Sequence, residues 1–153
     1  MSDRDQELAL KLWVVLARAH AAIAEHAASD AARHDLTFTE FGILEALYNK
    51  GPLLLGELQK KVLVSSGGIT YLVDRLEQRG LVERRKCETD RRATYAALTP
   101  DGEALIARIF PQHASCLQRV LAGLDEAEKL EATRLIRKLG TAAAASKGCH
   151  ESD

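Results

Sequence analysis

The chain has 153 residues, 46% of them hydrophobic and 28% charged, which suits one domain with an ordinary core and an attached oligomerisation element. Its formal net charge of −1 excludes a protein that is basic throughout, and the chain has no run of about 18 apolar residues that would predict a membrane span. Three scattered cysteines without a C-x-x-C pair exclude a disulfide framework and a cysteine zinc site, so we expect a cytoplasmic protein that needs no metal or cofactor.

The first half of the chain has the periodicity of helices. Apolar residues recur every three to four positions over residues 3–28, which predicts a long amphipathic helix. A second helix is predicted in DLTFTEFGILEALYNKG, where Thr37 and Glu40 form a capping box and Gly51 with Pro52 ends the element. The apolar stripe of this second helix is expected to be buried: Phe41, Leu44, Leu47 and Tyr48.

Two short helices follow, over residues 56–62 and 66–79, with Ser65 as the N-cap of the second and Gly80 after its last turn. The period then changes, because LVERRKC and RATYAALT have the pattern of two strands joined by the turn ETD. The middle of the chain therefore predicts a helix-turn-helix followed by a β-hairpin wing.

Helix resumes after the hairpin. Thr99 caps a long helix whose first residue is Pro100, and Asp125 with Glu128 forms the capping box of a last helix in LDEAEKLEATRLIRKLG. Residues 146–153 are expected to form a flexible tail. The predicted fold is mainly α with a small β-hairpin wing, in the order α-α-α-α-β-β-α-α.

Positive charge gathers in the middle of the chain, where residues 41–100 carry ten basic and seven acidic side chains. A helix-turn-helix places the start of its second helix in the major groove of DNA, and the predicted wing tip carries Asp90, Arg91 and Arg92. Arginine suits a narrow minor groove, and a nearby aspartate can orient its guanidinium. Further basic side chains lie on the first strand, within reach of phosphates: Arg84, Arg85 and Lys86.

Three segments resemble the MarR family of winged-helix transcription regulators: LTFTEFGILEALYNKGPLLLGELQKKV, GGITYLVDRLEQRGLVER and ETDRRATYAALTPDGEALI. The resemblance implies a homodimer built from residues 1–35 and 100–145, with residues 36–99 as the DNA-binding domain on a pseudo-palindromic operator. It also implies an effector or redox signal that changes the spacing of the two DNA-binding domains. SSGGITYLVDRLE and VERRKCETDRRATYA are most similar to the MhqR-like branch of quinone- and thiol-stress repressors.

The resemblance assigns roles to individual residues. Arg92 matches the arginine that enters the minor groove, Asp90 matches its orienting partner, and Ser65 matches the cap of the recognition helix. Thr70, Tyr71 and Arg75 match positions that face the groove or the phosphates, and we expect Ser66 to take part in sequence reading beside them. The sequence departs from the family at Ser66, where many members have proline, and at Gly67 and Gly68, where many have serine or threonine.

The two adjacent glycines have two interpretations. Each glycine inside a helix costs about 1 kcal/mol relative to alanine. Without a Cβ, Gly67 and Gly68 allow the free N–H groups of the helix start to approach a DNA phosphate, which is the interpretation we favour. The alternative is a flexible turn that enters the helix.

Two further sets of residues could sense a signal. Cys87 follows Arg85 and Lys86, whose charges would lower its pKa and make it a redox or electrophile sensor; the alternative is an inert thiol. Trp13, Leu16, Phe41 and Tyr48 are candidates for an effector pocket, although they also suit ordinary core packing. Histidines without metal-ligand spacing predict no metal site: His20, His26, His34 and His113.

The helix-turn-helix, the basic wing and the long flanking helices predict a dimeric, sequence-specific DNA-binding regulator. The resemblance implies a repressor released by a small phenolic or quinone-like compound or by thiol oxidation. The alternative is a winged-helix module that binds another protein and no DNA. An enzyme is not expected, because no nucleophile–base pair, paired carboxylates or metal motif is present in the sequence.

Overall fold

The computed structural model describes residues 3–62 and 66–146, and the chain divides into two compact units, Met1–Gln118 and Arg119–Asp153. The predicted N-cap Ser65, Cys149 and nearly all of the predicted tail lie outside the described residues. The elements of the chain are, in order: α1 (Asp3–Ala32), α2 (Phe38–Lys50), β1 (Leu53–Leu54), α3 (Leu55–Val62), α4 (Ser66–Gln78), β2 (Val82–Lys86), β3 (Thr94–Leu98), α5 (Pro100–Val120) and α6 (Glu126–Ala145).

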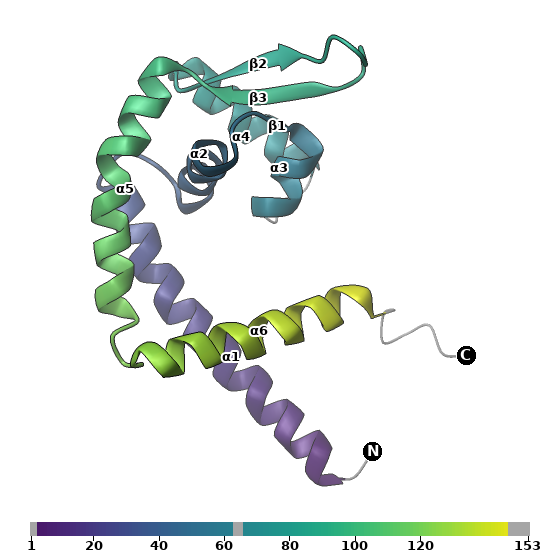
Figure 1. Cartoon of the computed structure of the whole chain (residues 1–153), viewed down its shortest axis with the longest axis vertical. Coiled ribbons are helices and arrows are strands. Elements are labelled where there is room, and N and C mark those ends of the chain that lie inside the picture. Colours follow the sequence, from purple (N-terminus) through teal and green to yellow (C-terminus); the bar gives the residue numbers. More distant parts are fainter. Residues whose placement is uncertain (1–2, 63–65, 147–153) are drawn as a thin grey trace. The chain divides into compact units, whose positions relative to one another are not determined.

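The three strands form an antiparallel sheet in the order β1-β3-β2. Strands β2 and β3 pair over their whole length, from Val82 opposite Leu98 to Lys86 opposite Thr94, and form the hairpin that projects from the helices in Figure 1. Strand β1 was not predicted, because a strand of two residues is too short to show an alternating pattern. The mainly α fold with a hairpin wing is confirmed.

The core lies where α2, α3, α4 and α5 meet the sheet. These helices and strands bury apolar side chains against one another, and the largest fully buried ones are Phe41, Ile43, Leu44, Leu58, Val73, Leu76, Val82, Ile106 and Ile109. Three of the four residues in the predicted stripe of α2 are buried. Tyr48 is the exception, because it is 41% exposed and packs its ring near Phe110 at the surface.

Local signals in the sequence set several element ends. Both predicted capping boxes are present, and in the first the Thr37 hydroxyl accepts from the Glu40 N–H while the Glu40 carboxylate accepts from the Thr37 N–H. Gly80 follows α4 with φ of 71°, which is the left-handed conformation that favours glycine. The last helix is longer than predicted, because the alanine run after Gly140 continues it to Ala145.

Close packing joins the start of α5 to the residues that follow α4. The Thr99 hydroxyl caps α5 by accepting from the Gly102 N–H, and the same hydroxyl donates to the Gly80 carbonyl. The Leu81 carbonyl accepts from the Thr99 N–H at 3.1 Å and lies directly against Gly102. The backbone therefore fixes α5 against the point where α4 leads into β2.

Candidate nucleic-acid interface

The predicted recognition helix α4 has one buried and one exposed face. Ile69, Val73 and Leu76 point into the core, whereas Thr70 and Tyr71 are exposed. The exposed face therefore offers polar and aromatic side chains to a partner, as expected for a helix that enters a groove.

The start of α4 is open. A Cβ at Gly67 would meet no atom within 4 Å, so nothing in the described part of the chain requires glycine there for packing. Ser66 is the first residue of the helix, and its contact with DNA stays a prediction, as does the approach of Gly67 and Gly68 to a phosphate.

A cluster of charged side chains ties α4 to α2. The Nε of Arg75 lies 3.2 Å from Oε1 of Glu40, and an Nη of Arg79 lies 3.6 Å from Oε2 of Glu40. The Tyr71 hydroxyl accepts from Arg75 at 3.5 Å, and this bond, with the Glu40 carboxylate as the second cause, raises the pKa of Arg75 above its usual value. Arg75 therefore contacts one buried side chain, Glu40 of α2, and one exposed side chain, Tyr71 of α4.

The wing tip is held by its backbone. The Asp90 carboxylate accepts from the Arg92 N–H at 3.0 Å, and the Asp90 carbonyl accepts from the Ala93 N–H at 3.1 Å. We predicted a carboxylate that orients the guanidinium of Arg92, but the carboxylate instead closes the turn through the backbone. Arg91 and Arg92 are both exposed at this tip, so their charges are available to a polyanion.

Arg84 has a different position from the predicted one. Its guanidinium lies 2.7 Å from Oδ1 of Asp74 and 3.4 Å from Oε1 of Glu77, and its backbone N–H donates to Glu77. Arg84 therefore braces the wing against α4 instead of standing free toward phosphates. Arg85 is more exposed and pairs at 2.7 Å with Glu83 on the same strand.

Cys87 lies at the end of the wing, half-buried, with its thiol 3.2 Å from the Thr89 hydroxyl. This hydrogen bond and the backbone of Thr89 and Asp90 lower the pKa of Cys87 below the usual value for a thiol. The lowering of the Cys87 pKa agrees with our prediction. The cause differs, because a hydroxyl and backbone groups stabilise the thiolate where we expected Arg85 and Lys86 to do so.

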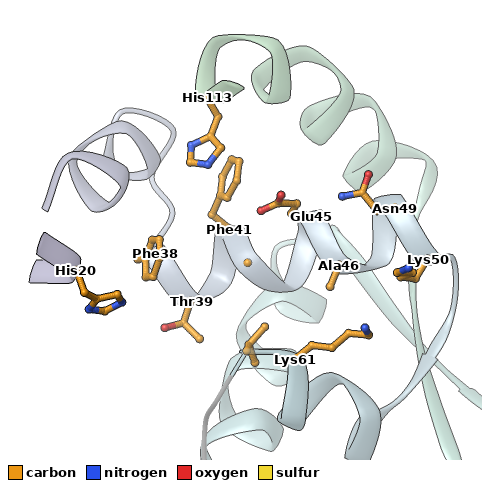
Figure 2. Close-up of a pocket in the computed structure, with 12 residues that line it drawn as sticks. His20, Phe38, Thr39, Phe41, Glu45, Ala46, Asn49, Lys50, Lys61 and His113 are labelled. Atoms are coloured by element: carbon orange, nitrogen blue, oxygen red, sulfur yellow. The ribbon is translucent and has the colours of Figure 1, made fainter. Parts of the chain in front are cut away.

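A cleft of about 540 Å³ opens beside α2 (Figure 2). In this view the Phe41 ring points at His113, with the two ring centroids 4.3 Å apart, and Phe38 and Lys61 border the opening. His113 is buried and its Nδ1 lies 3.1 Å from Oδ2 of Asp30 near the end of α1. The full lining is His20, Phe38, Thr39, Phe41, Gly42, Glu45, Ala46, Asn49, Lys50, Lys61, Val62 and His113.

Only Phe41 of the four predicted pocket residues lines this cleft. Tyr48 borders a separate hollow of about 260 Å³, and Trp13 and Leu16 line neither of these two cavities. Phe38, Lys61 and His113 were not predicted to line a pocket, because they are far apart along the chain and no spacing pattern connects them. Within the described residues, no three histidines, cysteines or carboxylates gather as metal ligands would.

Known proteins resemble this chain over the region that holds α2, α4 and the wing tip. The sequence pattern of the MarR family matches residues 34–93, from the end of α1 into the wing. The HTH-type transcriptional regulator MhqR of Bacillus subtilis is 41% identical over 134 residues, which cover 88% of this chain and 92% of MhqR.

The chain belongs to the MarR family.

Solved structures with the MarR-type fold include BpsR of Bordetella bronchiseptica, which is 27% identical with a TM-score of 0.77 over 85% of this chain and 98% of BpsR. The BpsR structure concerns the regulation of its DNA binding by 6-hydroxynicotinic acid. AbsC, a MarR family regulator of Streptomyces coelicolor, has a TM-score of 0.82 at 20% identity over 95% of this chain and 98% of AbsC, which shows the fold alone. In the described residues, no helix is long and apolar enough to cross a membrane.

Proposed function

We propose that this MarR-family chain is a homodimeric, sequence-specific DNA-binding repressor. The observation that carries the proposal is the pairing of two exposed elements in one unit: the outer face of α4 and the arginine-bearing wing tip. Arg84 ties these elements together through Asp74 and Glu77, so the helix and the wing present one continuous surface to a duplex.

Homodimerisation is supported by apolar side chains that the described residues leave uncovered. Trp13 is 67% exposed in α1, and Leu130 is 68% exposed in α6. Several leucines and valines of these two helices are also exposed, to a smaller extent: Leu8, Leu10, Leu12, Val14, Val15, Leu135 and Leu139. Soluble proteins rarely leave such extended apolar stripes open, and a second copy of these helices would cover them.

We assign effector binding to the cleft beside α2. The aromatic rings of Phe38 and Phe41 suit a small ring-shaped compound, and Lys61 at the opening suits a phenolate or carboxylate oxygen. The regulation of the relative BpsR by 6-hydroxynicotinic acid is consistent with a small aromatic effector. A second route to release is oxidation or alkylation of Cys87, whose lowered pKa favours the reactive thiolate.

The DNA-binding proposal is tested by fluorescence anisotropy with duplexes selected by the wild-type chain from a random library. Arg92→Ala is expected to weaken binding by about tenfold or more and to lower the slope of log affinity against log salt by about 1. Arg108→Ala, which removes an exposed arginine of α5 outside the wing, is the matched control and is expected to bind normally. Unchanged affinity and salt slope for Arg92→Ala would remove the wing from the interface.

The release mechanism is tested on the DNA-bound protein with catechol and p-benzoquinone. Release of both the wild-type and the Cys87→Ser chains assigns the response to the cleft. Release of the wild-type chain alone assigns it to the thiol. A chain that neither compound releases would refute the phenolic or quinone-like effector class.

A further inference from the structure

The Glu40 carboxylate is fully buried between α2 and α4, which is unusual for a charged group. Its Oε2 accepts from the Thr37 N–H, as a capping box requires, and also faces Arg79. Its Oε1 faces Arg75 at 3.2 Å, yet no group in the described part of the chain donates a hydrogen bond to it. The contact with Arg75 is therefore an ion pair whose alignment leaves one acceptor open.

Capping alone does not explain this arrangement. The second capping box, at the start of α6, uses Glu128 in the same way. Glu128 is exposed, and its carboxylate makes no ion pair within residues 3–62 and 66–146. A glutamate can thus cap a helix without burial and without arginines, so burial at Glu40 points to a second role.

The two arginines at Glu40 differ in what else they contact. Arg79 lies just beyond the end of α4 and donates to the Asp35 carbonyl at 2.6 Å, which ties it to the connection before α2. Arg75 has a 45% exposed side chain, and its guanidinium carbon lies 5.9 Å from the centre of the Tyr71 ring. Arg79 therefore closes a helix end, whereas Arg75 belongs to the exposed face of the recognition helix.

We propose that Glu40 is a positioning residue for DNA sequence selection, because it fixes the Nε edge of Arg75 and leaves the outer edge beside Tyr71 to read DNA. This inference rests on the proposed function. A guanidinium has five donors in a rigid fork, so one edge can be held while the other makes a bidentate contact. Fixing the side chain before binding lowers the entropy lost when the complex forms.

Loss of the Glu40 charge should change the affinity for the selected DNA sequence and the affinity for other DNA in different ways. Without the Glu40 charge, only the contacts with Tyr71 restrain Arg75, so its guanidinium turns more freely and the contact that depends on its direction weakens. Attraction to phosphates is not lost, because the substitution removes a negative charge and leaves every basic side chain in place. Simple damage to the fold would instead lower both affinities together.

The test compares the duplex selected by the wild-type chain with a scrambled duplex of the same length and composition, at several salt concentrations. Glu40→Gln is expected to lose about tenfold or more on the selected duplex and to keep or gain affinity for the scrambled one. Arg75→Gln should lose a similar factor on the selected duplex, and the double variant should lose no more than either single variant. Arg79→Gln is the matched control, because it touches the same carboxylate, and it should leave the ratio of the two affinities unchanged.

Three outcomes would overturn the inference: an equal loss on both duplexes, no loss on either, or additive losses in the double variant. If Glu40→Gln does not fold, Arg75→Lys replaces it, since it keeps the charge and removes the fork, and the same loss of ratio is expected. A wild-type chain that enriches no sequence would refute the proposed function as well. Enrichment by the wild-type chain with unchanged variants would refute this inference alone.

Discussion

The contact between Gly102 and Leu81 gives the sharpest prediction about stability. A Cβ at residue 102 would lie 1.9 Å from the Leu81 carbonyl oxygen, about 1.5 Å short of the 3.4 Å at which ordinary van der Waals contact begins. Alanine at this position therefore cannot be accommodated by a side-chain rotation, because the atom it meets belongs to the backbone. The Gly102→Ala substitution must move the start of α5 away from Leu81.

The free-energy cost of this movement follows from the clash, the hydrogen bond that breaks and the change in helix propensity. Overpacking of this kind costs about 1–3 kcal/mol, and loss of the Thr99 N–H bond to the Leu81 carbonyl costs about 1 kcal/mol more. The better helix propensity of alanine returns about 1 kcal/mol. The clash therefore outweighs the propensity gain, and Gly102→Ala is expected to lower the free energy of unfolding by about 2 kcal/mol.

The assay is urea unfolding at a fixed protein concentration, because an oligomer would make the midpoint depend on concentration. Gly56→Ala in α3 is the matched control, since a Cβ there would meet nothing within 4 Å. It is expected to leave stability unchanged or to raise it by up to about 1 kcal/mol. If Gly102→Ala proved as stable as Gly56→Ala, the close approach of α5 to Leu81 would be refuted.

Two other predictions concern the wing. The rate of Cys87 alkylation by iodoacetamide should reach half its maximum at a lower pH than for an ordinary thiol, because the lowered pKa keeps the thiolate populated at lower pH. Thr89→Val removes the hydroxyl and should move this midpoint to higher pH. A Thr89→Val chain with an unchanged midpoint would contradict the assigned cause. Arg84→Ala should reduce the hydrogen-exchange protection of β2 and lower the midpoint of thermal unfolding, because it removes the ion pairs that join the wing to α4. Arg85→Ala removes only an exposed pair within β2 and should change the free energy of unfolding by no more than about 0.5 kcal/mol. Equal effects of the two substitutions would argue against a brace.

The sequence predicted those features that short segments determine. The capping boxes at Thr37 and Asp125, the left-handed Gly80 and the β-hairpin all depend on residues close together in the chain, and each was found. The last helix was placed over LDEAEKLEATRLIRKLG, whereas α6 continues to Ala145, because the alanine run after Gly140 has a high helix propensity.

Features that depend on distant residues were less predictable. The capping box gave Glu40 a local explanation. Its contacts with Arg75 in α4 and with Arg79 just beyond the end of α4 left no sign in the spacing. Arg84 was expected to face DNA because it sits in a basic run, but the acidic residues of α4 lie close enough to draw it inward. The cleft likewise combines residues from α1, α2, α3 and α5, which only the tertiary structure brings together.

The first turns of α2 place two kinds of contact on adjacent residues. Thr39 and Phe41 line the cleft, while Glu40 between them points to the recognition helix. Single substitutions among the cleft residues can therefore change which compounds the cleft accepts without altering the contact between Glu40 and Arg75. An inserted or deleted residue in this turn would instead rotate the side chains on one side of the change by about 100° about the helix axis relative to those on the other side. Lineages of this protein should accordingly tolerate substitutions around Glu40 but preserve the number of residues between Thr37 and Phe41.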